Sequence, residues 1–301
     1  MRILHIDTGR EMRGGQHQVL LLMEGLREAG HECVLFARPG APLWHAAEKQ
    51  GFPVRFATIK QIFGASGTSA LVHAHDARGH TLASLAARAP LIVSRRVAFP
   101  VARSLASAWK YRRALRFIAV SHFVERELLK AGVPGEKIDV VPDGIELSHG
   151  PSAWNPAGPA VALASRDARK GRDLAELAAQ ISGRKVIFSE TLARDLAGAS
   201  LFVYITRSEG LGSAALMAMN AGVPVIASRV GGLPEAVLDG LSGILVENDA
   251  EEIVRAMRRL ADDPELARSL AECARSRVAE CFSRERLISG TLASYRRILA
   301  G

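Results

Sequence analysis

The sequence predicts an α/β fold made of two doubly wound parallel-sheet domains that face each other across a cleft. Three observations support this prediction. The chain has 301 residues, more than one ordinary hydrophobic core needs. Short apolar runs alternate with segments of helical periodicity along the whole chain, as expected when crossover helices join parallel strands. Residues 148–159 have no periodicity and contain two glycines and three prolines, so we place the linker between the domains there.

The first half begins with a predicted strand at residues 2–7, followed by a loop with Gly14 and Gly15 and a helix over residues 19–26. Gly30 ends this helix. The next elements are a strand at 33–37, a helix at 43–50, and strands at 54–56, 71–73, 91–94 and 117–120 with helical stretches between them. Together they predict a Rossmann-like domain over residues 1–148.

The second half repeats the alternation in a smaller domain, which we expect over residues 149–283. Its strands are expected at 161–164, 186–188, 201–205, 225–227 and 244–246, and its helices around 174–181, from Ser213, at 251–260 and from Pro264. We expect a last helix, residues 284–301, to pack back toward the N-terminal domain. Such sheets bind ligands at the carboxyl ends of their strands, but dehydrogenases, kinases and binding proteins share the topology, so it does not identify a function.

The composition indicates a folded protein that attracts anions and has no membrane span. Hydrophobic residues make up 48% of the chain, but no apolar run approaches the roughly 20 residues that a spanning helix needs. The chain leads from Met1 directly into a predicted strand, so we expect no signal peptide. Cys33, Cys273 and Cys281 lack metal-ligand spacing, and reduced thiols fit the cytoplasm. A net charge of +8 favours nucleotide phosphates, nucleic acid or anionic lipid as partners.

Residues 95–116 concentrate this positive charge. The segment has no acidic residue and seven basic ones, Arg95, Arg96, Arg103, Lys110, Arg112, Arg113 and Arg116, with Phe99, Trp109 and Tyr111 among them. It could hold an anionic acceptor, lie on an anionic membrane surface, where each cation contributes about 1 kcal/mol, or be a solvated helix face. Nucleic acid is not an expected partner, because the sequence contains no recognised nucleic-acid-binding module.

The most informative stretch is residues 208–228, which reads SEGLGSAALMAMNAGVPVIAS. A predicted strand ends near Ile205, an acid lies in the turn, and two glycines let the backbone approach a ligand closely. The helix that follows begins with free amide groups, which can hold a phosphate. This stretch resembles the nucleotide-sugar site of family 4 glycosyltransferases, which have the GT-B fold of two Rossmann-like domains around a cleft.

The resemblance implies a role for each residue of the turn. In the family, the first glutamate holds hydroxyls of the donor sugar, and the Gly-x-Gly turn and the next helix contact the sugar and the diphosphate. The matching residues here are Glu209, Gly210, Leu211, Gly212 and Ser213. Eight positions after the first glutamate the family usually has a second, which binds the ribose, but this chain has Met217 there. A thioether cannot accept two hydroxyl hydrogen bonds as a carboxylate does.

The segment at residues 165–171, SRDARKG, matches the place where the family neutralises the donor diphosphate with an arginine and a lysine. The resemblance assigns these roles to Arg166 and Lys170, with Arg169 as an alternative because the spacing is tight. Negative charge grows on the distal phosphate as the sugar leaves, and a fixed cation stabilises it without a metal. Without the resemblance, the segment would be interpreted as a solvated basic turn.

Several stretches of the first half resemble the family too. The loop with Gly14 and Gly15 is similar to one whose backbone approaches the donor phosphate and the acceptor, and it lacks the spacing of a dinucleotide site. Residues 72–76, VHAHD, match a motif that assigns contact with the sugar or acceptor to His75. We expect His73 and His75 to point to opposite faces of the strand and therefore not to bind one metal. Residues 119–122 and 132–146 match the closing strand and turn of the family's first domain.

Two further features concern the size of the second sheet and the need for a metal. Only 38 residues separate Lys170 from Glu209, where the family has an additional strand and helix, so we expect a smaller second sheet. We also expect that the binding site for the base of the donor nucleotide, near residues 188–190, is altered. The sequence has no Asp-x-Asp motif for a divalent ion. We therefore expect a metal-independent site that needs no cofactor besides its nucleotide-sugar substrate.

The resemblance implies a retaining hexosyltransferase in which His75 and Glu209 lie at the reacting centre. It would use a nucleotide sugar, UDP-sugar by preference, and a glycan or lipid-linked acceptor in cell-surface polysaccharide synthesis. The expected location is the cytoplasm, with contact to the inner face of the membrane through residues 95–116. Alternatives are a non-catalytic sugar-nucleotide-binding or scaffold protein of the same fold, to which Met217 would point, and a GT-B sugar epimerase or phosphorylase.

Overall fold

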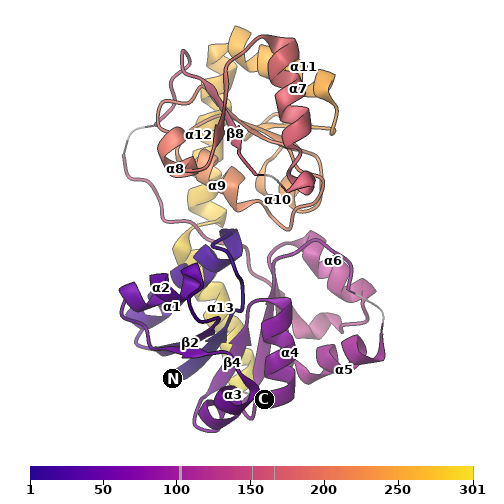
Figure 1. Ribbon diagram of the computed structural model, residues 1–301. Helices are drawn as coiled ribbons and strands as arrows, with labels where there is room; N and C mark the ends of the chain where they lie inside the picture. The colour runs from indigo at the N-terminus through magenta and orange to yellow at the C-terminus, as the bar shows by residue number, and fades with distance from the viewer. Residues whose placement is uncertain (102–103, 151, 166, 301) are drawn as a thin grey trace. The chain divides into compact units, whose positions relative to one another are not determined.

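A computed structural model of the chain describes residues 1–101, 104–150, 152–165 and 167–300 and contains two parallel-sheet α/β units (Figure 1). The first unit comprises Met1–Gly144 together with Arg284–Gly301, and the second comprises Ile145–Ser283. The chain therefore passes from the first unit to the second four residues before the boundary predicted after residue 148.

The first unit is built on a seven-stranded parallel sheet with the strand order β3-β2-β1-β4-β5-β6-β7. Its strands are β1 (Arg2–Ile6), β2 (Glu32–Ala37), β3 (Val54–Phe56), β4 (Leu71–Ala74), β5 (Leu91–Arg95), β6 (Arg116–Ala119) and β7 (Ile138–Val140). The chain order reverses between the neighbours β1 and β4. The carboxyl ends of these two strands therefore form the place where doubly wound sheets bind ligands.

In the described part of this unit, six α-helices connect these strands, and one from the end of the chain joins them. They are α1 (Gly14–Glu28), α2 (Pro42–Lys49), α3 (Ile59–Ser66), α4 (Ala77–Ala86), α5 (Leu105–Arg113), α6 (His122–Lys130) and α13 (Arg284–Leu299). α13 packs against α1, where a β-carbon on Gly25 would collide with the side chain of Ile288. Leu287 and Tyr295 of α13 are buried in the same core as Ile3, Leu22 and Leu35. The last helix of the chain is thus part of the first unit's interior.

The second unit has a five-stranded parallel sheet with the order β12-β11-β10-β8-β9, which confirms the prediction of a smaller second sheet. Its strands are β8 (Ala160–Leu163), β9 (Val186–Ser189), β10 (Leu201–Tyr204), β11 (Val225–Ser228) and β12 (Ile244–Val246). Its helices are α7 (Arg172–Ser182), α8 (Leu192–Asp195), α9 (Ser213–Asn220), α10 (Leu233–Ala236), α11 (Ala250–Asp262) and α12 (Pro264–Cys281). α7 packs against α11, and α9 packs against α12.

The start of α1 differs from the prediction. Gly14 and Gly15 were expected in a loop before the helix, but they are its first two residues. The backbone N–H of Arg13 donates to Oε1 of Gln16 at 3.2 Å, an arrangement that caps the helix and offsets the low helix propensity of glycine. As a result, the amides of both glycines belong to the first turn, where helix N–H groups have no partner within the helix.

None of the helices in the described part of the chain is both long enough and apolar enough to cross a membrane.

Candidate functional site

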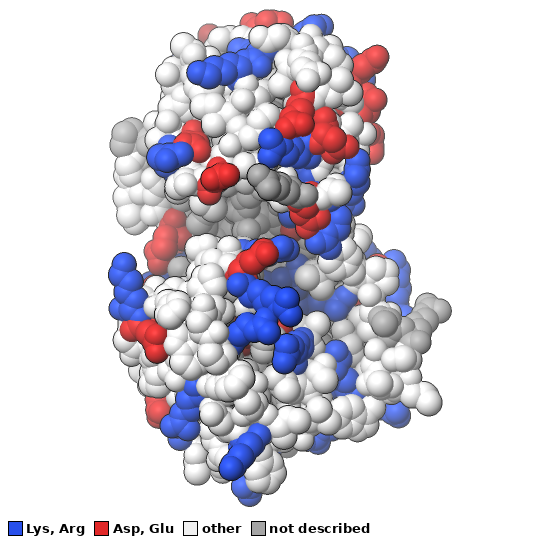
Figure 2. Space-filling model, viewed as in Figure 1, with Lys and Arg blue, Asp and Glu red and all other residues white. Residues whose placement is uncertain are grey.

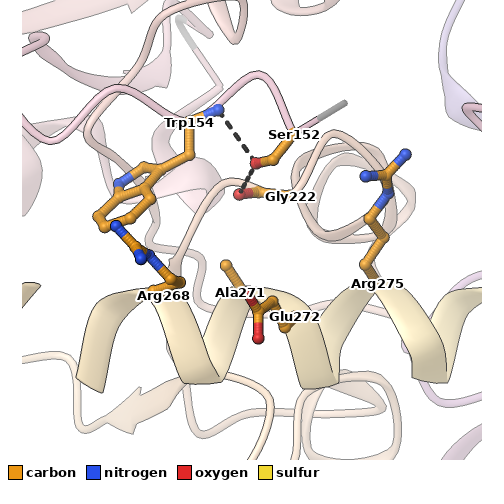
Figure 3. A pocket seen from close by; sticks show the side chains of 7 residues that line it. All are labelled: Ser152, Trp154, Gly222, Arg268, Ala271, Glu272 and Arg275. Atoms are coloured by element: carbon orange, nitrogen blue, oxygen red, sulfur yellow. Dashed lines mark hydrogen bonds between the residues drawn. The ribbon is translucent and has the colours of Figure 1, made fainter. Parts of the chain in front are cut away.

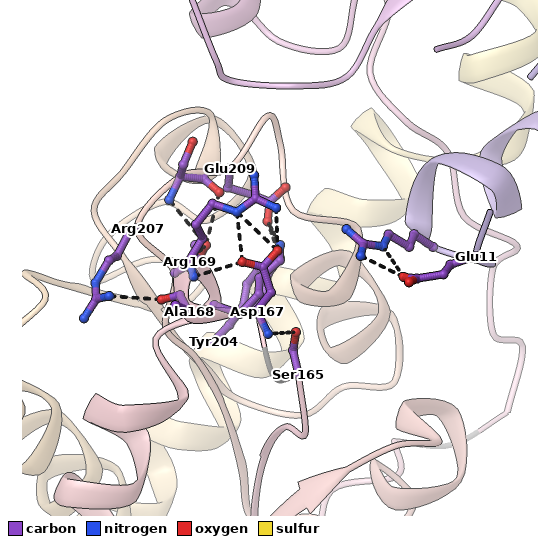
Figure 4. A network of polar contacts seen from close by, with 12 residues as sticks. Glu11, Ser165, Asp167, Ala168, Arg169, Tyr204, Arg207 and Glu209 are labelled. Carbon is purple, nitrogen blue, oxygen red and sulfur yellow. Dashed lines mark hydrogen bonds and ion pairs between the residues drawn. The ribbon is translucent and has the colours of Figure 1, made fainter. Parts of the chain in front are cut away.

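The two predicted side chains Lys170 and Glu209 are in direct contact in the second unit. Nζ of Lys170 lies 2.6 Å from Oε2 of Glu209, and the other carboxylate oxygen accepts a 3.2 Å hydrogen bond from the backbone N–H of Gly210. The hydroxyl of Tyr204, which the sequence analysis did not single out, lies 2.5 Å from the same Oε2 (Figure 4). The structure therefore places a cation, an acid and a buried phenol together beside the turn that opens α9.

The loop between β10 and α9 holds Glu209 in this position. The hydroxyl of Thr206 donates to the carbonyl of Arg169 at 3.0 Å, and the backbone N–H of Arg207 donates to the same carbonyl at 2.7 Å. From the other side, the side-chain amide of Asn248 donates to the carbonyl of Thr206 at 3.1 Å. The loop that carries Glu209 is thus tied to the segment that carries Lys170, which keeps the two charges together.

Glycines are required at two points where the backbone turns beside Glu209. Gly212 has φ +107, in the left-handed region, and a β-carbon there would lie 2.5 Å from Cδ2 of Leu233. Gly231 has φ +58, and its β-carbon would collide with the carbonyl oxygen of Glu209, which accepts a 3.0 Å hydrogen bond from Gly232. The turn at residues 231–235 therefore supports the loop that carries Glu209.

Arg169, the alternative to Lys170, is used elsewhere. Its guanidinium pairs with Asp167, with Nη2 2.5 Å from Oδ2 and Nε 2.9 Å from Oδ1 (Figure 4). Arg166, the other predicted cation, lies outside the described residues. Of the two candidates that can be placed, Lys170 is the one beside Glu209.

The remaining predicted residues of this unit lie in the turn after Glu209 and in the first two turns of α9. Leu211 and Gly212 are buried, and Ser213 is the first residue of α9. Met217 is half-buried further along the same helix. Its thioether brings no carboxylate to the place where the family's second glutamate would be.

Three histidines lie together at the carboxyl ends of β1 and β4 in the first unit. His5 and His73 are opposite each other in the two strands, and His75 follows the end of β4. The ring centroids of His73 and His75 are 4.0 Å apart, and those of His5 and His75 are 5.3 Å apart and stacked. The expectation that His73 and His75 point to opposite faces is therefore wrong, because residues two apart in extended chain share a face.

Hydrogen bonds determine which nitrogen of His75 carries its proton. Nη1 of Arg96, which can only donate, lies 3.4 Å from Nδ1 of His75. Nδ1 of His75 is therefore an acceptor, so the proton is on Nε2, which donates to Nδ1 of His5 at 3.0 Å. Arg96 also pairs with Asp143 at 2.8 Å, so its own position is fixed.

The three histidines are uncharged. Burial lowers the pKa of His5 from 6.5 to about 3, with the positive charge of Arg96 as a further cause. Burial, followed by the neighbouring histidines and Arg96, holds the pKa of His75 well below 6.5, and burial does the same for His73. The imidazole of His75 therefore offers a lone pair at neutral pH and no positive charge.

The three rings come close enough for one metal ion, with one nitrogen of each within 4.8 Å of the others. Their hydrogen bonds argue against such a site. The two nitrogens of His73 are bonded to the hydroxyls of Tyr295 and Ser94, each at 2.7 Å. A divalent ion would have to break bonds of this kind and would add charge next to the cation of Arg96. We interpret the group as a hydrogen-bonded cluster, and metal independence stays a prediction.

The first turn of α1 lies beside this cluster. A β-carbon on Gly15 would be 4.0 Å from Cδ of Arg96, an ordinary van der Waals distance, so the start of α1 borders the side chain of Arg96. Asp7, directly after β1, accepts from the side-chain amide of Gln16 at 3.0 Å and from the N–H of Gly9 at 2.9 Å. Burial and the charge of Asp76 raise the pKa of Asp7 from 3.8 to about 6.

Several cations of the basic segment, residues 95–116, hold the first unit together. Arg116 pairs with Asp139 at 2.7 Å, Arg95 donates to the hydroxyl of Tyr111 at 3.0 Å, and Arg113 donates to the carbonyls of Ser84 and Ala87. Arg103 lies outside the described residues. On the face that Figure 2 shows, Lys and Arg side chains predominate over Asp and Glu on the first unit.

α5, in the middle of this segment, has no buried residue. Leu105 is 90% exposed and Trp109, one helical turn later, is 43% exposed. Arg112 is exposed on the same helix. α5 therefore presents apolar side chains to solvent next to positive charge.

The second unit also has a pocket of about 310 Å³ where the linker passes over α12 (Figure 3). The described residues that line it are Ser152, Trp154, Gly222, Arg268, Ala271, Glu272 and Arg275. Arg275 donates to the carbonyl of Ser148, and the indole of Trp154 donates to the carbonyl of Ser200, so both side chains fasten the linker. This pocket contains none of the predicted donor-binding residues that the structure describes.

Sequence patterns did not single out His5, Asp143 or Tyr204, and they indicated Arg96 only as one of the seven cations of residues 95–116. Two of them stand at the carboxyl ends of strands: Tyr204 is the last residue of β10, and Arg96 directly follows β5. Side chains at the carboxyl ends of parallel strands meet at one edge, so each such position is a candidate. Asp143 lies in irregular chain after β7 and has no comparable signal.

Comparison with known families matches both halves of the chain. The family described as "Glycosyltransferase Family 4" matches residues 12–149, and the family described as "Glycosyl transferases group 1" matches residues 161–263.

Individual relatives are similar over shorter segments. The chain is 40% identical over 113 residues to the D-inositol 3-phosphate glycosyltransferase of Streptomyces avermitilis, covering 37% of this chain and 24% of that protein. It is 35% identical over 124 residues to the alpha-maltose-1-phosphate synthase of Mycolicibacterium smegmatis, covering 39% and 32%. The matches thus span about a quarter to a third of the length of these relatives.

Among solved structures, the Anabaena HepE protein in complex with UDP and glucose superimposes with a TM-score of 0.85 at 17% identity. The superposition covers 98% of this chain and 99% of that one. Similarity at this level of identity concerns the fold.

Proposed function

Because this chain belongs to the group 1 and family 4 glycosyltransferases and has their GT-B fold, we propose that it transfers a hexose from a nucleotide sugar to a glycan or lipid-linked acceptor. A UDP-sugar is the preferred donor, and the complex of HepE with UDP and glucose supports this choice. The proposed reaction retains the anomeric configuration, needs no metal and serves cell-surface polysaccharide synthesis at the cytoplasmic side of the membrane.

The observation that carries the proposal is the contact between Lys170 and Glu209 beside the glycine turn that opens α9. A diphosphate needs a cation and free amide donors, and a sugar needs a fixed hydrogen-bond acceptor. Lys170, the first turn of α9 and Glu209 supply these groups within one small region. In this proposal Lys170 and the amides hold the diphosphate, and Glu209 accepts a hydrogen bond from a hydroxyl of the attached sugar.

Bond changes in the proposed transfer take place on one face of the sugar. The bond between the anomeric carbon and the distal phosphate oxygen breaks, the acceptor oxygen bonds to the same carbon, and its proton passes to the departing phosphate. Lys170 stabilises the negative charge that grows on this phosphate. Glu209 positions the sugar and forms no covalent bond. We assign to His75 contact with the sugar or acceptor; a hydroxyl that donates to Nδ1 would take the place of the Arg96 guanidinium there.

Thermal stability in the presence of nucleotides tests the proposal. A ligand that binds only the folded chain raises its melting temperature, so UDP and UDP-sugars should raise it while other nucleotides raise it less. Incubation with the best UDP-sugar and candidate acceptors should then release UDP and yield a glycosylated product. A chain whose melting temperature does not respond to any nucleotide sugar would contradict the proposal.

Met217 favours a second candidate function, a protein of the same fold that binds sugar nucleotides without catalysis. In that case a UDP-sugar would raise the melting temperature, but no acceptor would be glycosylated. An epimerase or a phosphorylase is distinguished by incubation with the donor alone or with inorganic phosphate, since either enzyme would change the donor without a sugar acceptor.

We further propose that α5 rests on an anionic membrane surface, which would bring the chain to a lipid-linked acceptor. The exposed Leu105 and Trp109 would enter the interface while nearby cations such as Arg112 face the lipid phosphates. Co-sedimentation should show binding to vesicles with anionic lipid and not to zwitterionic vesicles. Serine at positions 105 and 109 should abolish it, whereas serine at Leu241, an exposed leucine of the second unit, should not. Equal binding by all variants would contradict this surface.

A further inference from the structure

Tyr204 is buried at the end of β10, directly behind the predicted sugar-binding acid. Its side chain stacks on that of Phe202, with ring centroids 5.7 Å apart, and only 3% of the residue is exposed. The hydroxyl is the one polar atom of this side chain, and it lies 2.5 Å from Oε2 of Glu209 and 3.3 Å from Nζ of Lys170. An apolar ring of the same shape would fill the space equally well. The hydroxyl therefore has a role besides packing.

The donors and acceptors of this group can be assigned without ambiguity. The ammonium group of Lys170 only donates, so the hydroxyl oxygen of Tyr204 accepts from it and the hydroxyl proton is directed to Glu209. Burial, followed by the charge of Glu209, raises the pKa of Tyr204 well above 10, so the phenol remains protonated at physiological pH. Tyr204 is therefore a permanent donor to the carboxylate.

The carboxylate of Glu209 is held on both oxygens. Among the described residues, Oε1 accepts from the N–H of Gly210, and Oε2 accepts from Tyr204 and Lys170. A carboxylate has about four lone-pair positions, so these three donors leave room for about one more hydroxyl. Tyr204 and Gly210 keep the carboxylate oriented even when Lys170 shares its donors with a phosphate.

We propose that Tyr204 is a positioning residue that orients Glu209 toward the donor sugar and links it to Lys170. This inference rests on the proposed function. The link holds the acceptor for sugar hydroxyls and the cation for the diphosphate at a fixed separation, so that the pair selects a sugar attached to a diphosphate over a nucleotide without sugar. Two N–H groups of Lys170 point to Glu209 and Tyr204, and the third can donate to a phosphate oxygen.

Calorimetric binding to Tyr204→Phe in the full chain tests this inference. The probes are UDP, UDP-glucose, UDP-galactose and UDP-N-acetylglucosamine, and the sugar nucleotide that the unmodified chain binds most tightly is compared with UDP. Tyr204→Phe should weaken binding of that sugar nucleotide about tenfold and change binding of UDP less than about threefold, because the lost hydrogen bond orients only the group that contacts the sugar. Phenylalanine keeps the ring on Phe202, so the chain should stay folded.

A matched control removes another buried hydroxyl of the same unit. Ser242 accepts a 2.8 Å hydrogen bond from the N–H of Leu238, outside the group of Lys170, Tyr204 and Glu209. Ser242→Ala should leave the ratio of the two affinities unchanged, even where it lowers the melting temperature. A change of the ratio in this control as large as in Tyr204→Phe would overturn the inference.

A second measurement separates positioning from general support. Tyr204→Phe introduced into a Glu209→Gln background should cause less than about twofold further loss, because its effect passes through the carboxylate. Additive losses, or an equal loss of UDP and sugar-nucleotide affinity in Tyr204→Phe, would overturn the inference and leave the proposed function intact. If the unmodified chain binds none of the four probes, the proposed UDP-sugar donor is wrong, and the inference, which rests on it, fails with it.

Discussion

Single residues in the segment before α7 have different roles although they are neighbours in the chain. Arg169 turns to Asp167, and Lys170 turns to Glu209 and Tyr204. Gly171, the next residue, has a left-handed backbone conformation with φ +54 and packs closely against Ile205. The local backbone thus directs the side chains of these two adjacent cations, which the sequence left as alternatives, to different partners.

The first prediction uses this difference. Lys170→Met should weaken UDP binding by about tenfold to a hundredfold, because it removes a charged donor to the diphosphate. Arg169→Met removes the same charge from the adjacent residue, whose guanidinium is paired with Asp167, and should change UDP binding less than about threefold. Calorimetric titration with UDP measures both. If Arg169→Met weakens UDP binding more than Lys170→Met does, Arg169 and not Lys170 contacts the phosphate.

The second prediction concerns Met217, a half-buried residue of α9, at the position where family 4 glycosyltransferases usually have their second glutamate. Met217→Glu should strengthen UDP binding about tenfold if the pocket otherwise has the family's shape, because a carboxylate can accept two ribose hydroxyls. Met217→Leu keeps an apolar side chain of similar size and should leave UDP binding unchanged. Unchanged affinity in Met217→Glu, measured by titration, would mean that other groups hold the ribose.

At the level of elements, loops fastened to one another position the second unit's site. The loop after β10 bonds to the carbonyl of Arg169, to Asn248 before α11, and to the turn at Gly231 and Gly232. None of these partners is adjacent to Glu209 in the chain. The strand ends bring them together, because parallel strands in one sheet present their following loops at the same edge.

The third prediction tests this support with two glycines of similar conformation. Gly231 has φ +58 and Gly240 has φ +70, but only a β-carbon at 231 would meet another atom, the carbonyl of Glu209. Gly240→Ala should lower the free energy of unfolding by about 1 kcal/mol, the cost of a left-handed alanine. Gly231→Ala should lower it by at least about 2 kcal/mol more and should also weaken UDP-sugar binding.

Chemical denaturation and titration of both variants check this third prediction. Equal losses of stability, with UDP-sugar binding preserved in Gly231→Ala, would show that the turn does not support Glu209.

On the scale of the whole molecule, the two units differ in their buried titratable groups. Among the described residues, four histidines have a pKa lowered to about 3 or well below 6.5, and all belong to the first unit. They are His5, His73, His75 and His80. Burial is the first cause in each case. The first unit should therefore respond to mild acid more strongly than the second.

The fourth prediction gives the sign of this response. Below pH 6.5 the unfolded chain binds protons that these buried histidines do not, so the free energy of unfolding falls as pH falls, by about 1.4 kcal/mol per pH unit for each histidine that stays neutral. Asp7 acts in the opposite direction, because its pKa of about 6 lets the folded chain hold a proton that the unfolded chain releases above 3.8. Four histidines outweigh this one acid.

Calorimetric melts between pH 7.5 and 5.5 check the fourth prediction. The melting temperature should fall steadily below pH 6.5, and His80→Gln should reduce the slope, since one such group is removed. A melting temperature that stays constant over this range would contradict the burial of neutral imidazoles.

Much of the fold and part of the site follow from local patterns in the sequence. Apolar runs with their glycine ends predict six of the seven strands of the first sheet and all five of the second to within a few residues, because these patterns extend over no more than a dozen neighbouring positions. β7 was indicated only by the family resemblance of residues 132–146. The acid and glycines at 209–212 and the basic turn at 165–171 are short motifs of the same kind. The local pattern was insufficient at Gly14 and Gly15, where the side chain of Gln16 caps the helix at Arg13 and α1 begins earlier than predicted.

Only the tertiary structure decides which of these residues meet. His73 bonds to Tyr295, 222 positions away, because the last helix returns to the first unit, and His5 reaches His75 because β1 and β4 are neighbours in the sheet. The preference for Lys170 over Arg169 and the presence of Tyr204 behind Glu209 likewise depend on the direction of side chains at strand ends. Contacts of this kind arise from sheet order and packing over long chain distances, and no local pattern of residues encodes them.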